Sequence, residues 1–187
     1  MGAGRVRGSE SRDVVDIITF IESDWGLKMK LFPIQRVILK AHYGIPLDDK
    51  IKDVPVSDWR RINNRMMTEL EYLQYLYDDG RCNINYVEEG HERREMILSV
   101  GRRSGKTTIS ACVAAYETYK LISKGDPQAF YGLPASNVIQ LISVATDKDQ
   151  AGLLYNEVSG HFRNCTFFTP YMACLLYTSP SPRDKTV

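Results

Sequence analysis

Apolar residues recur at three- and four-residue spacing in five stretches of the chain, which is the pattern of amphipathic helices. Ser11 and Asp13 are suitable caps for the first helix. Pro33 suits the first turn of the second helix, which ends before Gly44, and Ser57 begins the third. The five predicted helices lie over residues 14–21, 33–43, 57–77, 105–124 and 148–158.

Three apolar runs predict β-strands, at residues 82–87, 94–100 and 137–144. The second run is almost wholly apolar from residue 96 onward, as expected of a strand covered on both faces. From this run on, strands alternate with helices, which predicts a parallel sheet with right-handed crossovers. The predicted fold class is therefore α/β, with a mostly parallel sheet flanked by helices and preceded by an N-terminal helical segment.

Composition places the chain among soluble globular proteins, with 43% hydrophobic and 25% charged residues in a length of 187. Lys plus Arg number 24 against 23 Asp plus Glu, so net charge supplies no evidence for a nucleic-acid partner, although a local basic patch would suffice. The four cysteines form no C-x-x-C pair and have no His at zinc-like spacing, which predicts reduced thiols. No apolar run approaches the length needed to span a bilayer.

The second predicted strand leads directly into a glycine-bounded loop. Its residues are Gly101, Arg102, Arg103, Ser104, Gly105, Lys106, Thr107 and Thr108. Glycines let the chain curl so that backbone N–H groups face a triphosphate, and the helix opened by Gly105 adds its positive end. Lys106 supplies a positive charge for the β- and γ-phosphates, and the Thr107 hydroxyl is placed to ligate Mg²⁺. The sequence therefore predicts a phosphate-binding loop of the P-loop type.

The loop departs from the standard pattern at its first glycine. The pattern G-x-x-x-x-G-K-[ST] would place that glycine at position 100, where this chain has Val100, and Gly101 comes one residue later. In this it resembles the deviant Walker A loop of the large terminase subunits of tailed bacteriophages. Residues 25–47 and 142–151 are similar to that family's segments before and after the loop. The resemblance covers roughly residues 20–173.

The resemblance implies roles for individual residues. Lys106 and Thr107 would bind phosphate and Mg²⁺, with the remaining loop residues around the phosphates of ATP. Arg102 matches an arginine proposed in that family to stabilise the charge on the γ-phosphate in cis, and a solvated loop arginine is the alternative. Arg103 would face solvent or DNA. Gln35 matches an adenine-contacting glutamine, and an ordinary polar residue on an amphipathic helix is the alternative.

Members of that family package viral DNA into an empty capsid shell. The resemblance implies an ATPase that uses ATP and Mg²⁺ and acts on double-stranded viral DNA in the host cell cytoplasm, transiently at the procapsid. Its implied partners are the portal protein, a small terminase subunit and further copies of itself in a ring, with no membrane.

Two functional parts of that family are missing from the sequence. The Mg²⁺-holding acid and the water-activating Glu would appear as about four apolar residues followed by Asp-Glu, and no such stretch follows the loop. Asp147 matches the segment before that motif and is not assigned. The carboxylates of the family's nuclease domain are absent as well. We therefore expect an N-terminal ATPase fragment that binds nucleotide and hydrolyses it poorly.

Three parts are expected along the chain. Residues 1–10 are Gly- and Arg-rich and predicted to be disordered, and residues 11–173 form a partial terminase-like P-loop ATPase domain. Residues 174–187 resemble a translated sequencing adapter, with a natural Ser/Pro-rich tail as the alternative. Two other functions stay open from the sequence: another P-loop DNA motor such as a helicase, and a nucleotide-binding module without hydrolysis.

Overall fold

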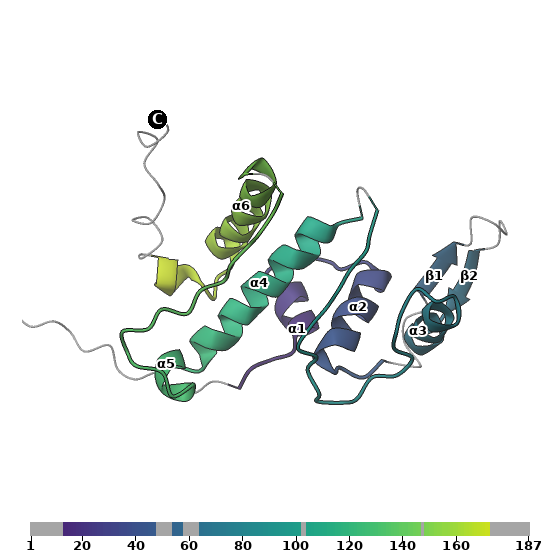
Figure 1. Ribbon diagram of the computed structural model, residues 1–187, viewed down its shortest axis with the longest axis horizontal. Coiled ribbons are helices and arrows are strands. Elements are labelled where there is room, and N and C mark those ends of the chain that lie inside the picture. The colour runs from purple at the N-terminus through teal and green to yellow at the C-terminus, as the bar shows by residue number, and fades with distance from the viewer. Residues whose placement is uncertain (1–12, 48–53, 58–63, 102–103, 147, 173–187) are drawn as a thin grey trace, which may run out of the picture. The chain divides into compact units, whose positions relative to one another are not determined.

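The computed structural model describes residues 13–47, 54–57, 64–101, 104–146 and 148–172 (Figure 1). These residues fall into two compact units. Val15–Glu22 and Met29–Ser104 form the N-terminal unit, and Ser23–Lys28 with the chain from Gly105 onward form the C-terminal unit. The predicted disordered segment 1–10 and the predicted tail 174–187 lie outside the described residues.

The N-terminal unit begins with the short helix α1 (Ile17–Glu22). Its buried residues are Ile17, Ile18, Phe20 and Ile21. The cap of this helix is Asp16, because the amide and the hydroxyl of Thr19 donate to its two carboxylate oxygens at 3.0 and 2.7 Å. The predicted cap at Asp13 is wrong, since a capping side chain must lie directly before the first helical residue.

Helix α2 (Pro33–Tyr43) confirms the prediction at both ends. Pro33 is its first residue, where the fixed φ of proline suits a helix and the missing N–H costs nothing. Gly44 ends the helix at φ +65°, and a Cβ there would lie 2.6 Å from the backbone nitrogen of His91. The Gly90 amide donates to the Gly44 carbonyl at 2.9 Å. The chain approaches the helix end this closely only because residue 44 has no side chain.

Strands β1 (Val54–Ser57) and β2 (Asn64–Met67) pair antiparallel, with Val54 opposite Met67. Figure 1 shows the pair beside α3. The predicted helix from Ser57 is therefore wrong over residues 64–67, and residues 58–63 lie outside the described residues.

A capping box marks the start of helix α3 (Glu69–Asp78). The Thr68 hydroxyl accepts the Glu71 amide at 3.2 Å, and the Glu71 carboxylate accepts the Thr68 amide at 3.1 Å. This reciprocal pair satisfies two amides that the helix itself cannot bond. It fixes the start of the helix twelve residues later than the apolar spacing suggested. The predicted end at residue 77 agrees to within one residue, since α3 ends at Asp78.

A buried set of charges connects the three helices of the N-terminal unit. Lys40 Nζ of α2 lies 2.6 Å from Glu69 Oε2 of α3, and these residues are 4% and 1% exposed. Arg36 of α2 pairs with Glu22 of α1, and its Nε lies 3.9 Å from Glu69 Oε1. Charges at this depth persist in proteins when they are paired, so the set fixes α2 against its neighbours.

The C-terminal unit is built on α4 (Lys106–Ser123) and α6 (Lys148–Asn164), which pack against each other, with the short α5 (Pro127–Phe130) between them in sequence. Both long helices lie where the sequence predicts them. Their core includes Ile109, Ala111, Cys112, Ala115, Tyr116, Tyr119, Cys165 and Phe168. Burial, together with the nearby Glu157 carboxylate, raises the pKa of the Cys112 thiol to about 12.

The three runs predicted as strands form no β-ladder among the described residues. Several of their apolar side chains are exposed, including Ile97 at 91%, Ile142 at 77% and Val144 at 88%. A strand requires hydrogen bonds to a neighbouring strand, which apolar character alone does not provide. The parallel sheet is thus not seen in the described part of the chain and stays a prediction.

Candidate functional site

The phosphate loop makes a tight turn immediately before α4. Within the loop, the Ser104 hydroxyl donates to the Gly101 carbonyl at 2.8 Å. Directly before the helix, Gly105 has φ +75°, a left-handed conformation that glycine adopts without steric cost. Gly105 is therefore required by the backbone of this turn. Arg102 and Arg103 lie outside the described residues, so their predicted roles stay predictions.

The first amides of α4 have no side-chain cap. Its N-cap residue is Gly105, which has no side chain to accept them. By contrast, the helix starts at Glu69 and Pro127 are capped by Thr68 and Asp126, respectively. Because α4 has 18 residues, its dipole adds positive potential at this end. Uncapped amides at such an end are suited to the oxygens of a phosphate group.

Lys106 and Thr107 are the first two residues of this helix. Lys106 is exposed, whereas Thr107 and Thr108 are half-buried. One turn further, Ile109 is 4% exposed and anchors the helix in its own core. The structure therefore combines an exposed cationic side chain, a hydroxyl and uncapped amides on the first turn of a packed helix. This donor set fits a triphosphate with its Mg²⁺.

Gln35 lies in the first turn of α2, within the N-terminal unit, and is half-buried. Its side-chain oxygen accepts the Phe32 amide at 3.0 Å, which is the N3 half of a capping box. The sequence carries a signal for this role, because Phe32 and Pro33 at the helix start place Gln35 at N3. Sequence reasoning treated Gln35 as a base contact or a plain surface residue and missed its structural role.

Within the described residues, no group of three or more His, Cys, Asp and Glu side chains could hold a metal ion. His161 of α6 does lie near Glu157, but burial lowers the pKa of His161 more than this carboxylate raises it. Asp147 lies outside the described residues. The described acids and imidazoles thus supply no metal site separate from the phosphate loop.

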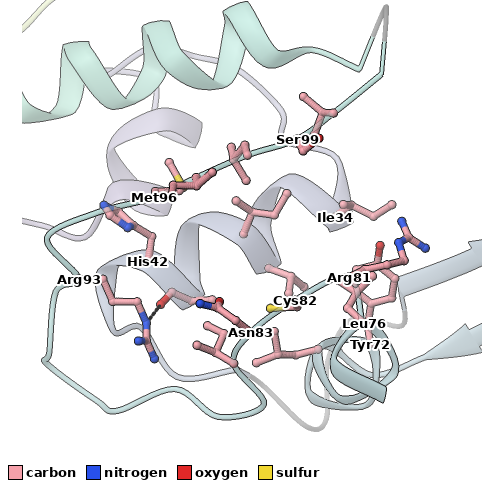
Figure 2. Close-up of a pocket in the computed structure, with 18 of the residues that line it drawn as sticks. Ile34, His42, Tyr72, Leu76, Arg81, Cys82, Asn83, Arg93, Met96 and Ser99 are labelled. Carbon is pink, nitrogen blue, oxygen red and sulfur yellow. Dashed lines mark hydrogen bonds between the residues drawn. The ribbon is translucent and has the colours of Figure 1, made fainter. Parts of the chain in front are cut away.

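A pocket of about 880 Å³ opens in the N-terminal unit, a volume within the range of small-molecule sites. Figure 2 shows Met96 and Ser99 along one wall, with Cys82 and Asn83 across from them and α2 behind. The Arg93 guanidinium lies at the rim and donates to the Ala41 carbonyl at 3.3 Å.

No feature of the sequence predicted this pocket. It is lined by residues 96–100, which have no strand partner among the described residues, and by side chains of α2 and α3. Gln35 and the loop residues Gly101 and Ser104 are not among the residues that line it, although the neighbouring Ile34 is. The pocket and the phosphate loop are therefore formed by different residues.

Among the described residues, no helix combines the length and the apolar character needed to cross a membrane.

A Gly-Lys-Thr turn that enters a packed helix through a left-handed glycine, with the helix amides uncapped, is the loop-to-helix half of a P-loop. Comparison with known families agrees. The chain belongs to the family described as "Uncharacterized protein MJ0330, N-terminal P-loop domain", whose profile matches residues 8–174. This membership implies nucleotide binding. No curated protein and no solved structure matches the chain significantly.

Proposed function

We propose that the chain is the ATP-binding part of a DNA-packaging motor of the terminase type. The nucleotide-binding part of this proposal is supported by the P-loop family match, which spans the whole loop 101–108. The terminase assignment is supported by the order of residues in that loop, where the first glycine is shifted by one place and an arginine follows it. The match to the P-loop family is the observation that carries the nucleotide-binding part of the proposal.

Each loop residue receives a role in this proposal. Lys106 neutralises the β- and γ-phosphates, and the uncapped amides of α4 donate to phosphate oxygens. The Thr107 hydroxyl would help to hold Mg²⁺, which would supply positive charge beside the phosphates. Arg102 stabilises the charge that develops on the γ-phosphate during transfer. Arg103, Ser104 and Thr108 complete the wall of the loop.

The proposal extends to the fold and the partners. Residues 94–100 and 137–144 become strands of a parallel sheet, with α4 as the crossover that follows the phosphate loop. The motor acts on double-stranded viral DNA in the host cytoplasm as a ring at the portal protein, together with a small terminase subunit. Because no Asp-Glu motif follows the loop in this sequence, nucleotide binding is the property to test first.

The test compares Lys106→Ala with Lys124→Ala, a matched change of a lysine at the opposite end of the same helix. Binding of a fluorescent ATP analogue with Mg²⁺ is followed by anisotropy on the full chain. Loss of the Lys106 charge is expected to weaken binding at least about tenfold, the effect of one charge-assisted contact. Lys124→Ala is expected to bind like the unaltered chain. Equal affinity in all three chains would refute the phosphate-loop assignment.

A second measurement addresses the motor. ATP turnover is measured with and without linear double-stranded DNA. Stimulation of even a slow turnover by the DNA supports a packaging motor. Tight nucleotide binding with no turnover in either condition would instead favour a nucleotide-binding module without hydrolysis.

A further inference from the structure

The pocket beside α2 and α3 lies within the N-terminal unit and shares no residue with the phosphate loop. Three of its lining residues belong to the buried core of that unit: Val37, Tyr72 and Leu73 are 1%, 5% and 2% exposed. Residues 96–100 line it as well (Figure 2). A molecule that entered the pocket would therefore contact core side chains, where its apolar atoms would leave water.

Most of the lining side chains are apolar. They come from α2, from α3 and from the run 96–100, and they include Ile34, Val37, Ile38, Leu73, Leu76 and Met96. Each methylene group that leaves water on binding tightens the affinity of a ligand about fourfold. The body of a ligand that fits this lining is therefore a hydrocarbon.

The charged side chains of the pocket are two guanidinium groups and one carboxylate, from Arg81, Arg93 and Glu95. Arg93 is held at the end of α2, because its backbone amide donates to the His42 carbonyl at 2.9 Å and its Nε donates to the Ala41 carbonyl at 3.3 Å. The terminal nitrogens of its guanidinium carry further N–H donors. A guanidinium held in this way is suited to a planar oxyanion such as a carboxylate.

Arg81 adds to the positive charge at the pocket. Its Nη1 lies 3.8 Å from Asp79 Oδ2, but the two side chains are 59% and 52% exposed. Solvent screens a pair this exposed, so the Arg81 side chain can turn toward an entering anion at little cost. The charge of the pocket is thus complementary to an anion, whereas its apolar lining is complementary to a hydrocarbon.

We propose that this pocket binds an amphipathic carboxylate, with its hydrocarbon body against the apolar lining and its carboxylate paired with Arg93. A neutral hydrocarbon would gain nothing from the two arginines, and an ammonium group would be repelled by them. Because the pocket and the phosphate loop are formed by different residues, this site is independent of the proposed nucleotide binding.

Isothermal titration calorimetry on the full chain tests the proposal with decanoate and decanol, which share a ten-carbon body and differ in charge. We expect decanoate to bind at least about tenfold more tightly than decanol, the effect of one charge-assisted contact. Octanoate, which has two methylene groups fewer, should bind about fifteenfold more weakly than decanoate.

Two neighbouring arginines provide a matched pair of variants. Arg93 lines the pocket, whereas Arg94 is exposed and is not among the lining residues. Arg93→Gln should reduce the preference for decanoate over decanol to about threefold or less, and Arg94→Gln should leave it unchanged. Since both ligands are measured on the same chain, any general weakening of the pocket cancels from this ratio.

A second measurement locates the bound carboxylate without any substitution. Cys82 lines the pocket and is partly buried, and its alkylation by iodoacetamide can be followed by mass spectrometry. At a decanoate concentration about ten times the dissociation constant, alkylation of Cys82 should slow about tenfold, because about one pocket in eleven is then empty.

Three results would overturn the proposal. Equal affinities for decanoate and decanol would mean that the pocket takes apolar molecules regardless of charge. An equal loss of the preference in Arg93→Gln and Arg94→Gln would mean that Arg93 does not pair with the carboxylate. An unchanged alkylation rate at Cys82 would place the bound decanoate elsewhere on the chain.

Discussion

Removing the carboxylate of Glu69 should destabilise the N-terminal unit strongly. Glu69 and Lys40 are 1% and 4% exposed, and their charged atoms lie 2.6 Å apart. In Glu69→Gln the side chain keeps its volume, but the buried ammonium of Lys40 loses its counter-charge. Breaking one partner of such a buried pair costs about 3–5 kcal/mol, most of it from the charge left in a poorly solvated place.

That cost is a large share of the 5–15 kcal/mol that stabilises a typical domain. For a chain of this size it corresponds to a fall in Tm of about 6–20 °C. Urea unfolding followed by circular dichroism gives the free energy directly. The double variant Lys40→Met with Glu69→Leu should recover most of the loss, because it removes the Lys40 ammonium together with its counter-charge, while Arg36 keeps its ion pair with Glu22.

A second ion pair supplies the control. Lys120 Nζ lies 3.1 Å from Glu117 Oε1 on α4, but these side chains are 21% and 31% exposed. Solvent screens this pair, so Glu117→Gln should cost below about 1 kcal/mol. A loss for Glu69→Gln no larger than that for Glu117→Gln would refute the reasoning, since it would mean that water reaches the Glu69 carboxylate. The coupling between Lys40 and Glu69 would be refuted if the double variant lost as much stability as the two single variants lose together.

Two further predictions concern single side chains. Thr68→Ala removes the cap of α3 and should cost about 1 kcal/mol in urea unfolding, whereas Thr68→Ser, which keeps the hydroxyl, should cost only a few tenths. Burial raises the pKa of the Cys112 thiol from 9.0 to about 12, so its contribution to stability is fully present below pH 9 and is lost as the pH rises toward 12. At pH 10 the loss relative to pH 8 should be about 1.4 kcal/mol, and Cys112→Ala should abolish this part of the pH dependence; an identical pH slope in that variant would contradict the assignment.

Local signals account for the parts of the fold that the sequence predicted correctly. Pro33 and Gly44 bound α2 because proline and glycine act on their own backbone dihedrals, whatever surrounds them. The prediction failed at Ser57 and over residues 64–67, where the apolar spacing predicted a helix and the chain forms parts of β1 and β2. The capping box at Thr68 and Glu71 was present in the sequence and would have placed the helix start correctly.

The candidate site likewise has features that the local sequence predicts and features that it does not. The glycine, lysine and threonine of the loop are adjacent in sequence, so their common turn follows from local chain geometry. The capping bond of Gln35 is also local, three residues long, and was missed only because a family resemblance suggested another role. The pocket beside α2 depends on segments up to 66 residues apart, from Ile34 to Val100, and no local pattern could predict it.

The run predicted as a strand before the phosphate loop depends on both local and non-local interactions. Burying Ile97, Ile142 and Val144, now 91%, 77% and 88% exposed, would contribute about 1.5–3 kcal/mol for each side chain. The three together approach the net stability of a whole domain. Pairing of these runs with strand neighbours is therefore strongly favoured by composition, even though composition does not say which neighbours they take.

The loop leaves one such run at Gly101 and enters α4 at Gly105. Its turn depends on the left-handed Gly105 and on the Ser104–Gly101 hydrogen bond, both of them local, whereas the rigidity with which it would hold a triphosphate depends also on the strand before it. The local half of a P-loop can thus be recognised in a sequence before the sheet that supports it can be derived.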